Sequence, residues 1–338
     1  MHSTLKKIAI PLTLLIAIFV LACKVEHSSD KKQETSSTAA TKSVYRIGVV
    51  GFGPDEAAEQ CFKGLVDGLK ELGFAEGKNL EIKRTNAQGE IANIPLLFQN
   101  YDGMGLDAIV PMTTPCLTAA CTTVKKTPVV FTYVYDPVAA GAGKNQNDHL
   151  PFVTGTSSFP PLEDTLVMIQ KVIPDTKSIG ILYNPSEANS VKVISVVREL
   201  ATKHNVKLEE VTVNNTSDVY PAAQSVASKN IQALWVAGDN TVNQSFDAMA
   251  KVSAESHIPL FTNDPEYTAR GALMAVGITW YKSGRESAKK LAQVLKGESP
   301  AKIPFLNYVE KLLLINPANA KTLGITFPDD VLKQAEKL

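Results

Sequence analysis

Short apolar runs alternate with longer amphipathic segments through most of the chain, beginning at Tyr45. The first run, 45–50, precedes an amphipathic stretch that reaches Leu72 and ends at Gly73. This alternation indicates βαβ units, because two parallel strands need a long crossover connection between them. The pattern therefore predicts an α/β fold with parallel sheets.

The pattern starts again in the second half of the chain. Residues 128–132 read Pro-Val-Val-Phe-Thr and residues 258–262 read Ile-Pro-Leu-Phe-Thr, and each run is the fourth predicted strand of its half. Such a repeat favours one architecture used twice. The predicted strands are 45–50, 80–84, 108–110, 128–132, 178–183, 206–213, 233–236 and 258–262. The later predicted helices include 187–204, 217–228 and one that reaches about residue 256.

We therefore predict two Rossmann-like lobes that are joined by a hinge. The N-terminal lobe is expected at 44–160 and the C-terminal lobe at 161–276. A return segment, 277–338, is expected to cross between the lobes. Two such lobes form a cleft that a hinge can close.

The first 22 residues are typical of a secretory signal peptide. Lys6 and Lys7 give a positive start, and an apolar run, 8–22, follows. A membrane-spanning helix needs about 20 apolar residues, so this run is short for one. It ends in Val-Leu-Ala-Cys at Cys23, which resembles the bacterial lipobox. We predict a signal peptide at 1–22 and a lipidated Cys23; the alternative is an ordinary signal peptide in which Cys23 is incidental.

Residues 23–43 are polar and contain almost nothing apolar. Such a segment cannot form a core, and we predict a flexible tether. A lipid, a tether and a globular body together describe a protein that is held at a membrane surface while its body works in water.

Charge and motif content exclude several classes of function. The chain has 34 basic and 34 acidic side chains, so it lacks the positive charge of a nucleic-acid-binding protein, and we expect no nucleic-acid partner. The four cysteines are too few for a disulfide scaffold at this length. The sequence has no metal-binding spacing and no histidine paired with a nucleophile in a known arrangement. We expect no catalytic residues, no metal and no cofactor.

Polar side chains gather just after the predicted strands. Ligands of open parallel sheets bind outside the carboxyl ends of the strands, where loops and helix starts converge. These positions lack a cluster of cations, which argues against a phosphate or polyanion ligand. The candidate ligand-binding residues are Thr113, Thr114, Tyr133, Asp136, Ser186, Asn189, Ser190, Asp239, Asn240 and Asp264.

Structural roles compete with ligand binding at several of these positions. Thr114 and Ser186 are expected to cap the helices that follow them, and Asp239 can also be a cap. Tyr133 and its neighbour at 135 either line a cleft or pack between the lobes. The loop 51–55 lacks the Gly-x-Gly-x-x-Gly spacing, so a dinucleotide site is unsupported.

Several motifs in the body of the chain resemble one family. They are 64–74 (Gly-Leu-Val-Asp-Gly-Leu-Lys-Glu-Leu-Gly-Phe), 86–89 (Asn-Ala-Gln-Gly), 182–190 (Leu-Tyr-Asn-Pro-Ser-Glu-Ala-Asn-Ser), 239–242 (Asp-Asn-Thr-Val) and 270–273 (Arg-Gly-Ala-Leu). With the lipobox and the two lobes, they resemble the ABC transporter substrate-binding lipoproteins of the tryptophan/tyrosine-uptake type, which have the periplasmic-binding-protein type 1 fold. The resemblance implies an interlobe cleft that holds a free amino acid, often aromatic, for delivery to a membrane permease.

The chain departs from this family pattern in two loops. Residues 51–54 read Gly-Phe-Gly-Pro where a polar or histidine-containing loop is more typical, and residues 263–265 read Asn-Asp-Pro where a Ser-Asp-Thr-like stretch is more typical. Both loops face the expected cleft. The resemblance therefore leaves the side chain of the ligand open.

We expect a monomeric, lipid-anchored, extracytoplasmic protein that binds a small amino acid and presents it to an ABC permease with its ATPase. The alternatives are a ligand-sensing receptor subunit that uses the same cleft, and an enzyme on the same fold. The ammonium of an amino acid needs a counter-charge in such a cleft. Asp239 is expected to supply it, because Asp136 and Asp264 each precede a proline in a turn; Asp264 is the next candidate.

Overall fold

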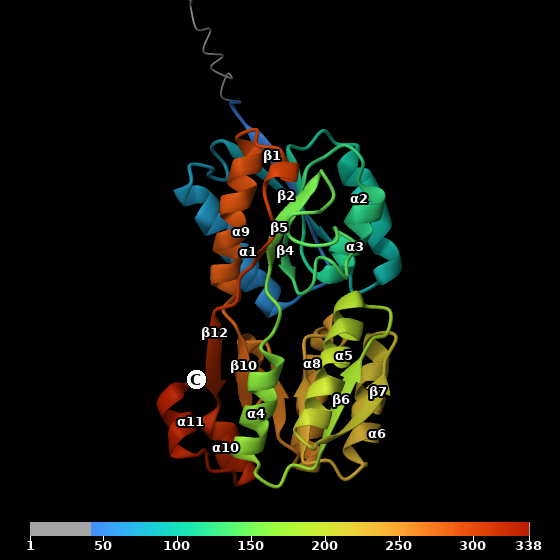
Figure 1. Cartoon of the computed structure of the whole chain (residues 1–338), viewed down its shortest axis with the longest axis vertical. Coiled ribbons are helices and arrows are strands. Elements are labelled where there is room, and N and C mark those ends of the chain that lie inside the picture. The colour runs from blue at the N-terminus through green and yellow to red at the C-terminus, as the bar shows by residue number, and fades with distance from the viewer. Residues whose placement is uncertain (1–41, 338) are drawn as a thin grey trace, which may run out of the picture. The chain divides into compact units, whose positions relative to one another are not determined.

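The structure of the protein is a computed structural model that describes residues 42–337. The predicted signal peptide, Cys23 and most of the tether lie outside the described residues. The described residues belong to one compact unit, which contains two α/β lobes (Figure 1). None of its helices between residues 42 and 337 is both long enough and apolar enough to cross a membrane.

The N-terminal lobe is a six-stranded sheet with helices on both faces. Its strand order is β11-β5-β4-β3-β1-β2, and each neighbouring pair is parallel. The strands are β1 (Tyr45–Gly51), β2 (Leu80–Asn86), β3 (Ala108–Pro111), β4 (Val129–Val134), β5 (Val153–Ser157) and β11 (Leu306–Asn307). The helices are α1 (Glu56–Glu71), α2 (Ile94–Asp102), α3 (Thr114–Thr123) and α9 (Trp280–Leu295), with short 3-10 helices η1 (Ile91–Asn93) and η4 (Pro300–Lys302).

The C-terminal lobe is a seven-stranded sheet in the order β13-β12-β10-β9-β8-β6-β7. Its neighbouring strands are parallel except β10 and β12, which are antiparallel. The strands are β6 (Ser178–Tyr183), β7 (Lys207–Thr212), β8 (Ala233–Val236), β9 (Leu260–Thr262), β10 (Met274–Ile278), β12 (Lys311–Ile315) and β13 (Glu336–Lys337). The helices are α4 (Leu162–Val172), α5 (Ala188–Lys203), α6 (Val219–Ala227), α7 (Asn240–Gln244), α8 (Phe246–Ser256), α10 (Pro317–Leu323), α11 (Asp329–Gln334), η2 (Thr216–Asp218) and η3 (Pro265–Arg270).

The predicted fold class is confirmed, since both lobes are α/β and their sheets are mostly parallel. Each of the eight strands predicted from the sequence is present, and the helix predicted at 187–204 is α5. The single helix predicted to reach about residue 256 is wrong in one respect, because the chain breaks it into α7 and α8 at Ser245.

The apolar runs of the strands are continuous because both faces of each sheet are covered. Successive strand residues point to opposite faces. In β1, Ile47 and Val49 pack in the cluster that contains α1 and α9, whereas Val50 packs in the cluster that contains α2 and α3. All three side chains are at most 1% exposed.

The chain passes three times between the two lobes. It does so between β5 and α4, between β10 and α9, and between β11 and β12. The boundaries predicted at 160/161 and 276/277 lie beside the first two passages. After residue 277, the chain first adds α9 and β11 to the N-terminal lobe and then adds β12 and β13 to the C-terminal sheet (Figure 1).

Helices α1 and α9 lie side by side with their backbones in contact (Figure 1). A Cβ atom on Gly64 would lie 1.9 Å from the carbonyl oxygen of Tyr281, and one on Gly284 would lie 1.9 Å from the carbonyl oxygen of Cys61. The two glycines therefore allow an approach that no other residue allows. This contact joins α9, which follows the second passage, to the core of the N-terminal lobe.

We predict that Gly284→Ala destabilises the protein. The added methyl group must push α1 and α9 apart, and overpacking of this kind costs about 1–3 kcal/mol. The free energy of unfolding, measured by urea denaturation, is expected to fall by this amount. Gly103→Ala is the matched control, because a Cβ atom there would meet its nearest neighbour at an ordinary 3.5 Å. Equal stability of the two variants would contradict the prediction.

Candidate functional site

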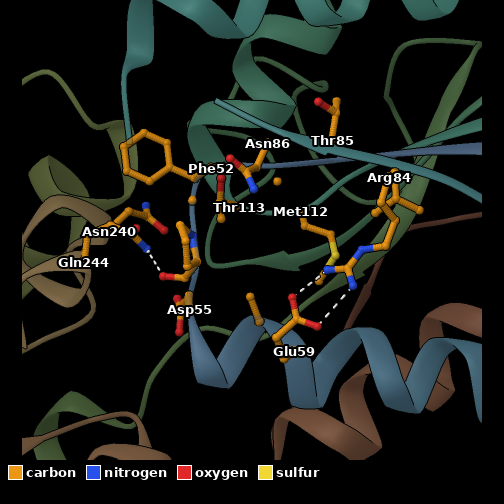
Figure 2. A pocket seen from close by; sticks show the side chains of 15 residues that line it. Phe52, Asp55, Glu59, Arg84, Thr85, Asn86, Met112, Thr113, Asn240 and Gln244 are labelled. Carbon is orange, nitrogen blue, oxygen red and sulfur yellow. Dashed lines mark hydrogen bonds and ion pairs between the residues drawn. The ribbon is translucent and has the colours of Figure 1, made fainter. Parts of the chain in front are cut away.

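Two neighbouring cavities lie where the carboxyl ends of the strands of both lobes meet. The outer cavity has a volume of about 290 Å³ (Figure 2). It is lined by Val49, Gly51, Phe52, Gly53, Pro54, Asp55, Ala58, Glu59, Arg84, Thr85, Asn86, Met112, Thr113, Asn240 and Gln244. The inner cavity, of about 10 Å³, has room for about one water molecule. It is lined by Thr114, Tyr133, Tyr135, Asn189, Gly238, Asn240 and Asn243.

The N-terminal lobe contributes the start of α3. Thr113 is the N-cap residue, and its Oγ1 accepts a hydrogen bond from the backbone N–H of Cys116 at 3.5 Å. Its φ of 94° is rare for a residue with a side chain, and such backbone strain concentrates at functional sites. The expectation that Thr114 is the cap is wrong by one residue. Thr114 instead accepts a hydrogen bond from the backbone N–H of Tyr135 at 3.3 Å.

Tyr133 lies in β4 and Tyr135 directly follows it, and both share one aromatic neighbour, Trp280. The rings of Tyr133 and Trp280 lie 4.4 Å apart in an edge-to-face arrangement, and those of Tyr135 and Trp280 are stacked at 6.0 Å. Both tyrosines also line the inner cavity. For Tyr135 the two roles that the sequence left open coexist, because its ring also lies against Gly238 of the C-terminal lobe.

Asp55 is a half-buried carboxylate that contacts both lobes. It caps α1 by accepting a hydrogen bond from the N–H of Ala57 at 3.0 Å. It also accepts hydrogen bonds from the hydroxyl groups of Tyr133, at 2.8 Å, and of Tyr267 in η3, at 2.9 Å. The sequence interpretation overlooked Asp55 among the carboxylates at strand ends, although it stands four residues after β1 in the first of these loops.

Glu187 fills the start of α7 in the C-terminal lobe. Its carboxylate accepts hydrogen bonds from the backbone N–H groups of Asn240 and Thr241, at 3.1 and 2.9 Å, and from both of their side chains. The expected cap at Ser186 is wrong, because the N-cap residue of α5 is Glu187 and Ser186 is exposed to solvent. The anion-binding end of α7 is thus occupied by a carboxylate of the chain itself.

The carboxylate of Asp239 is fully engaged by its own lobe. It accepts hydrogen bonds from the N–H groups of Val242 and Asn184, at 2.8 and 2.6 Å, and from the hydroxyl group of Ser190 at 2.5 Å. This disagrees with the expectation that Asp239 is free to supply the counter-charge of the ammonium. Asp136 also holds a turn, because it accepts from the N–H groups of residues 138 and 139.

Two amide oxygens beside the inner cavity have no hydrogen-bond partner in the described part of the chain. They are Oδ1 of Asn189 and Oδ1 of Asn243. The amide nitrogen of Asn189 donates to the carbonyl oxygen of Gly238 at 3.1 Å, and that of Asn243 donates to Asp264 at 3.1 Å. These acceptors fix which end of each amide is the oxygen. Asp264 also accepts a hydrogen bond from the indole N–H of Trp280 at 2.9 Å.

Three acidic side chains, Asp55, Asp264 and Glu266, lie close enough together in this region for the charge of one to raise the pKa of another. Burial, and then the charge of Asp55, raise the pKa of Asp264 to about 7. Burial, and then the charges of Asp264 and Asp55, raise the pKa of Glu266 to about 8. Burial also raises the pKa of Asp55, against the hydrogen bonds that it accepts. No ion pair between residues 42 and 337 includes these three groups.

At the polar end of the outer cavity, Arg84 and Glu59 form an ion pair with each other. Arg84 of β2 donates two hydrogen bonds to the carboxylate of Glu59 in α1, at 2.6 and 3.1 Å (Figure 2). The guanidinium also lies 3.8 Å from the ring centre of Phe62. Over residues 42–337, no group of three His, Cys, Asp or Glu side chains is placed to hold a metal ion.

Several contacts join the lobes directly across the cavities, and the hydrogen bond from Trp280 to Asp264 is one of them. Besides the hydrogen bond from Tyr267 to Asp55, the side chain of Gln244 donates to the carbonyl oxygen of Pro54 at 2.6 Å (Figure 2). The ring of Tyr135 also lies against Gly238, where a Cβ atom would come within 2.0 Å of the tyrosine oxygen. The cleft is therefore closed in this structure.

A sequence profile of the family described as ABC transporter substrate binding protein matches residues 46–338. The chain belongs to this family. It is 29% identical to the tyrosine-binding protein of Clostridioides difficile over 303 residues, which cover 90% of this chain and 87% of that protein.

Two solved structures extend this likeness. An ABC domain from Streptococcus pneumoniae in complex with L-Trp is 29% identical, with a TM-score of 0.84. A substrate-binding protein with adhesive properties from Clostridium difficile, in its ligand-free open form, is 28% identical, with a TM-score of 0.65. Each comparison covers 87% of this chain and 99% of the other. The relatives have the periplasmic-binding-protein type 1 fold, and the lobes of this family member are arranged more like those of the L-Trp complex.

We predict that the free energy of unfolding falls as the pH rises from about 4 to about 8. The raised pKa values of Asp264 and Glu266 mean that the folded protein keeps protons in this range that the unfolded chain, with carboxyl pKa values near 4, has lost. Urea denaturation at a series of pH values measures the slope. Asp264→Asn is expected to flatten it, because an amide can still accept from Trp280 while the amide of Asn243 turns over. An unchanged slope in this variant would contradict the assignment.

Proposed function

We propose that this family member captures a free L-amino acid with an aromatic side chain between its lobes and delivers it to an ABC permease with its ATPase. The observation that carries the proposal is the opposite character of the two walls of the cleft. One wall offers hydrogen-bond donors at a helix start, and the other offers unpaired amide oxygens beside a carboxylate. An amino-acid zwitterion matches both.

The carboxylate of the ligand is assigned to the start of α3. The hydroxyl groups of Thr113 and Thr114 can donate to it, and the dipole of the helix favours an anion there. The N–H groups of the first turn contribute little, because Pro115 has none and that of Cys116 donates to Thr113. The start of α7 is not available in the same way, because Glu187 already accepts its N–H groups. The carboxylate therefore faces the N-terminal lobe.

The ammonium is assigned to the opposite wall. The free oxygens of Asn189 and Asn243 line the inner cavity, and the carboxylate of Asp264 lies one hydrogen bond behind Asn243. These groups replace Asp239 as the expected partners of the ammonium. Because the inner cavity measures about 10 Å³, the lobes must separate to admit the ligand and then close over it.

The side chain of the ligand is assigned to the outer cavity. Phe52, Pro54 and Met112 give this cavity apolar walls, and its volume of about 290 Å³ is at the low end of small-molecule sites. The relatives that are named for tyrosine or contain L-Trp support an aromatic side chain.

The proposed cellular setting follows from the family and from the N-terminal sequence. The protein acts outside the cytoplasm as a monomer, is held to a membrane by a lipid on Cys23, and reaches the permease on the tether at 23–43. It carries out no chemistry on the ligand.

Calorimetry with L-Trp and L-Tyr tests the proposal, with Gly238→Ala as the decisive variant. The wild-type protein is expected to bind at least one of the two amino acids, and small-angle scattering is expected to show a smaller radius of gyration with ligand. In Gly238→Ala the added Cβ atom meets Tyr135 and blocks closure, so binding is expected to weaken tenfold or more, about 1.4 kcal/mol.

Gly141→Ala is the matched control for Gly238→Ala. The two glycines have nearly the same φ, 83° and 84°, so alanine strains the backbone alike, but a Cβ atom on Gly141 meets nothing within 4 Å. Equal binding by both variants would contradict the closure mechanism. No detectable binding of any L-amino acid to the wild-type protein would overturn the proposed function.

We predict that Cys23→Ser releases the protein from membranes. The tether has no apolar face that could replace acyl chains. Fractionation of cells should move the variant from the membrane to the soluble fraction, and metabolic labelling with a fatty acid should be lost. Membrane association that persists in the variant would contradict the lipid anchor.

A further inference from the structure

We propose that the ammonium is the obligatory recognition element of the cleft, so that aromatic alkylamines without a carboxylate are also ligands, whereas the corresponding acids without an amine are not. The proposal deepens the proposed function and rests on the same site. It separates two ligand ends that an amino acid always carries together.

The first step is the imbalance of charge around the cavities. Asp55 from the N-terminal lobe and Asp264 and Glu266 from the C-terminal lobe meet between the lobes, and within residues 42–337 none of them is paired with a lysine or arginine. The cationic side chain that lines the outer cavity, Arg84, is neutralised by Glu59. A cation that binds here can replace the protons that Asp264 and Glu266 retain, whereas a second anion finds no free positive charge among the residues that line the cavities.

The second step is independent of these carboxylates. Asn189 and Asn243 are 2% and 4% exposed, and each leaves an amide oxygen without a partner beside the inner cavity. Both oxygens are acceptors, so the ligand group that binds them must donate hydrogen bonds. A buried acceptor without a partner is costly, and an ammonium with its three N–H groups satisfies both.

The third step concerns the aromatic rings. Tyr133 and Tyr135 line the same cavity, and their ring centres lie 4.4 and 6.0 Å from that of Trp280. The face of an aromatic ring attracts a cation, most strongly where water is excluded. Rings, amide oxygens and carboxylates therefore point to the same positively charged group.

The carboxylate end of the ligand has weaker partners. Among the described residues of the cleft it is assigned two hydroxyl groups, those of Thr113 and Thr114, and the start of one helix. No guanidinium or ammonium among the residues that line the two cavities is free to pair with it, since Arg84 is held by Glu59. Loss of the carboxylate should therefore reduce affinity far less than loss of the ammonium.

Calorimetry on the full chain with three matched pairs of probes compares the loss of the carboxylate with the loss of the ammonium. The probes are L-Trp and L-Tyr, tryptamine and tyramine, and 3-(indol-3-yl)propionate and 3-(4-hydroxyphenyl)propionate. The amines are expected to bind with dissociation constants within about 30-fold of those of the amino acids. The acids are expected to bind at least 300-fold more weakly than the amino acids.

Two variants locate the effect. Asp264→Asn is expected to weaken the amino acid and the amine by the same factor, because both present an ammonium. Thr113→Val keeps the shape of the side chain and is expected to weaken only the amino acid. Thermal unfolding checks that each variant is folded, and the probe series on the unaltered chain decides the matter even if a variant is not.

The outcomes distinguish this inference from the proposed function. Binding of amino acids without binding of amines overturns the inference and leaves the proposed function standing, and so does binding of the acids as tightly as the amines. Binding of amines without binding of any amino acid supports the inference and overturns the proposed function. Binding of none of the six probes overturns both.

Discussion

Asp55 holds the two lobes in contact through two phenol groups, Tyr133 from one lobe and Tyr267 from the other. A carboxylate that is removed from water without a cation carries a penalty of several kcal/mol, which hydrogen bonds to neutral donors offset in part. Asp264 meets the same constraint with Trp280 and Asn243. In the closed arrangement, neutral hydrogen-bond donors surround the carboxylates. A ligand that brings a positive charge offsets the remaining desolvation penalty of these carboxylates and so favours closure.

The geometry of this region depends on packing that lies outside the cleft. The close contact of α1 and α9 at Gly64 and Gly284 fixes α9 on the N-terminal lobe. Trp280 is the first residue of that helix, so its indole reaches Asp264 of the C-terminal lobe while its ring contacts Tyr133. A glycine contact between two helices thus positions a donor at the hinge side of the site.

The sequence predicts the parts of the site that depend on position after a strand. Thr113, Tyr133 and Asn189 line the cavities because parallel strands end at one edge of a sheet. Trp280 could not be found in this way, since its place depends on how the chain passes between the lobes. Asn243 was missed because it lies inside α7, beyond the loop that directly follows β8. Asp239 and Ser186 were misjudged because loop-to-loop hydrogen bonds have no signature in local sequence.

The two lobes differ in the groups that they leave free for a ligand. In the proposed cycle, this difference determines which lobe the ligand binds first. In the N-terminal lobe the start of α3 is bordered by Thr113 and Thr114 and carries no acidic side chain of its own in the first turn. In the C-terminal lobe Glu187 has already neutralised the start of α7. A carboxylate can therefore dock on the open N-terminal lobe, but the unpartnered groups that the C-terminal lobe brings to the inner cavity are the amide oxygens of Asn189 and Asn243. Closure of the C-terminal lobe then depends on the ammonium, so selection takes place at closure and not at first contact.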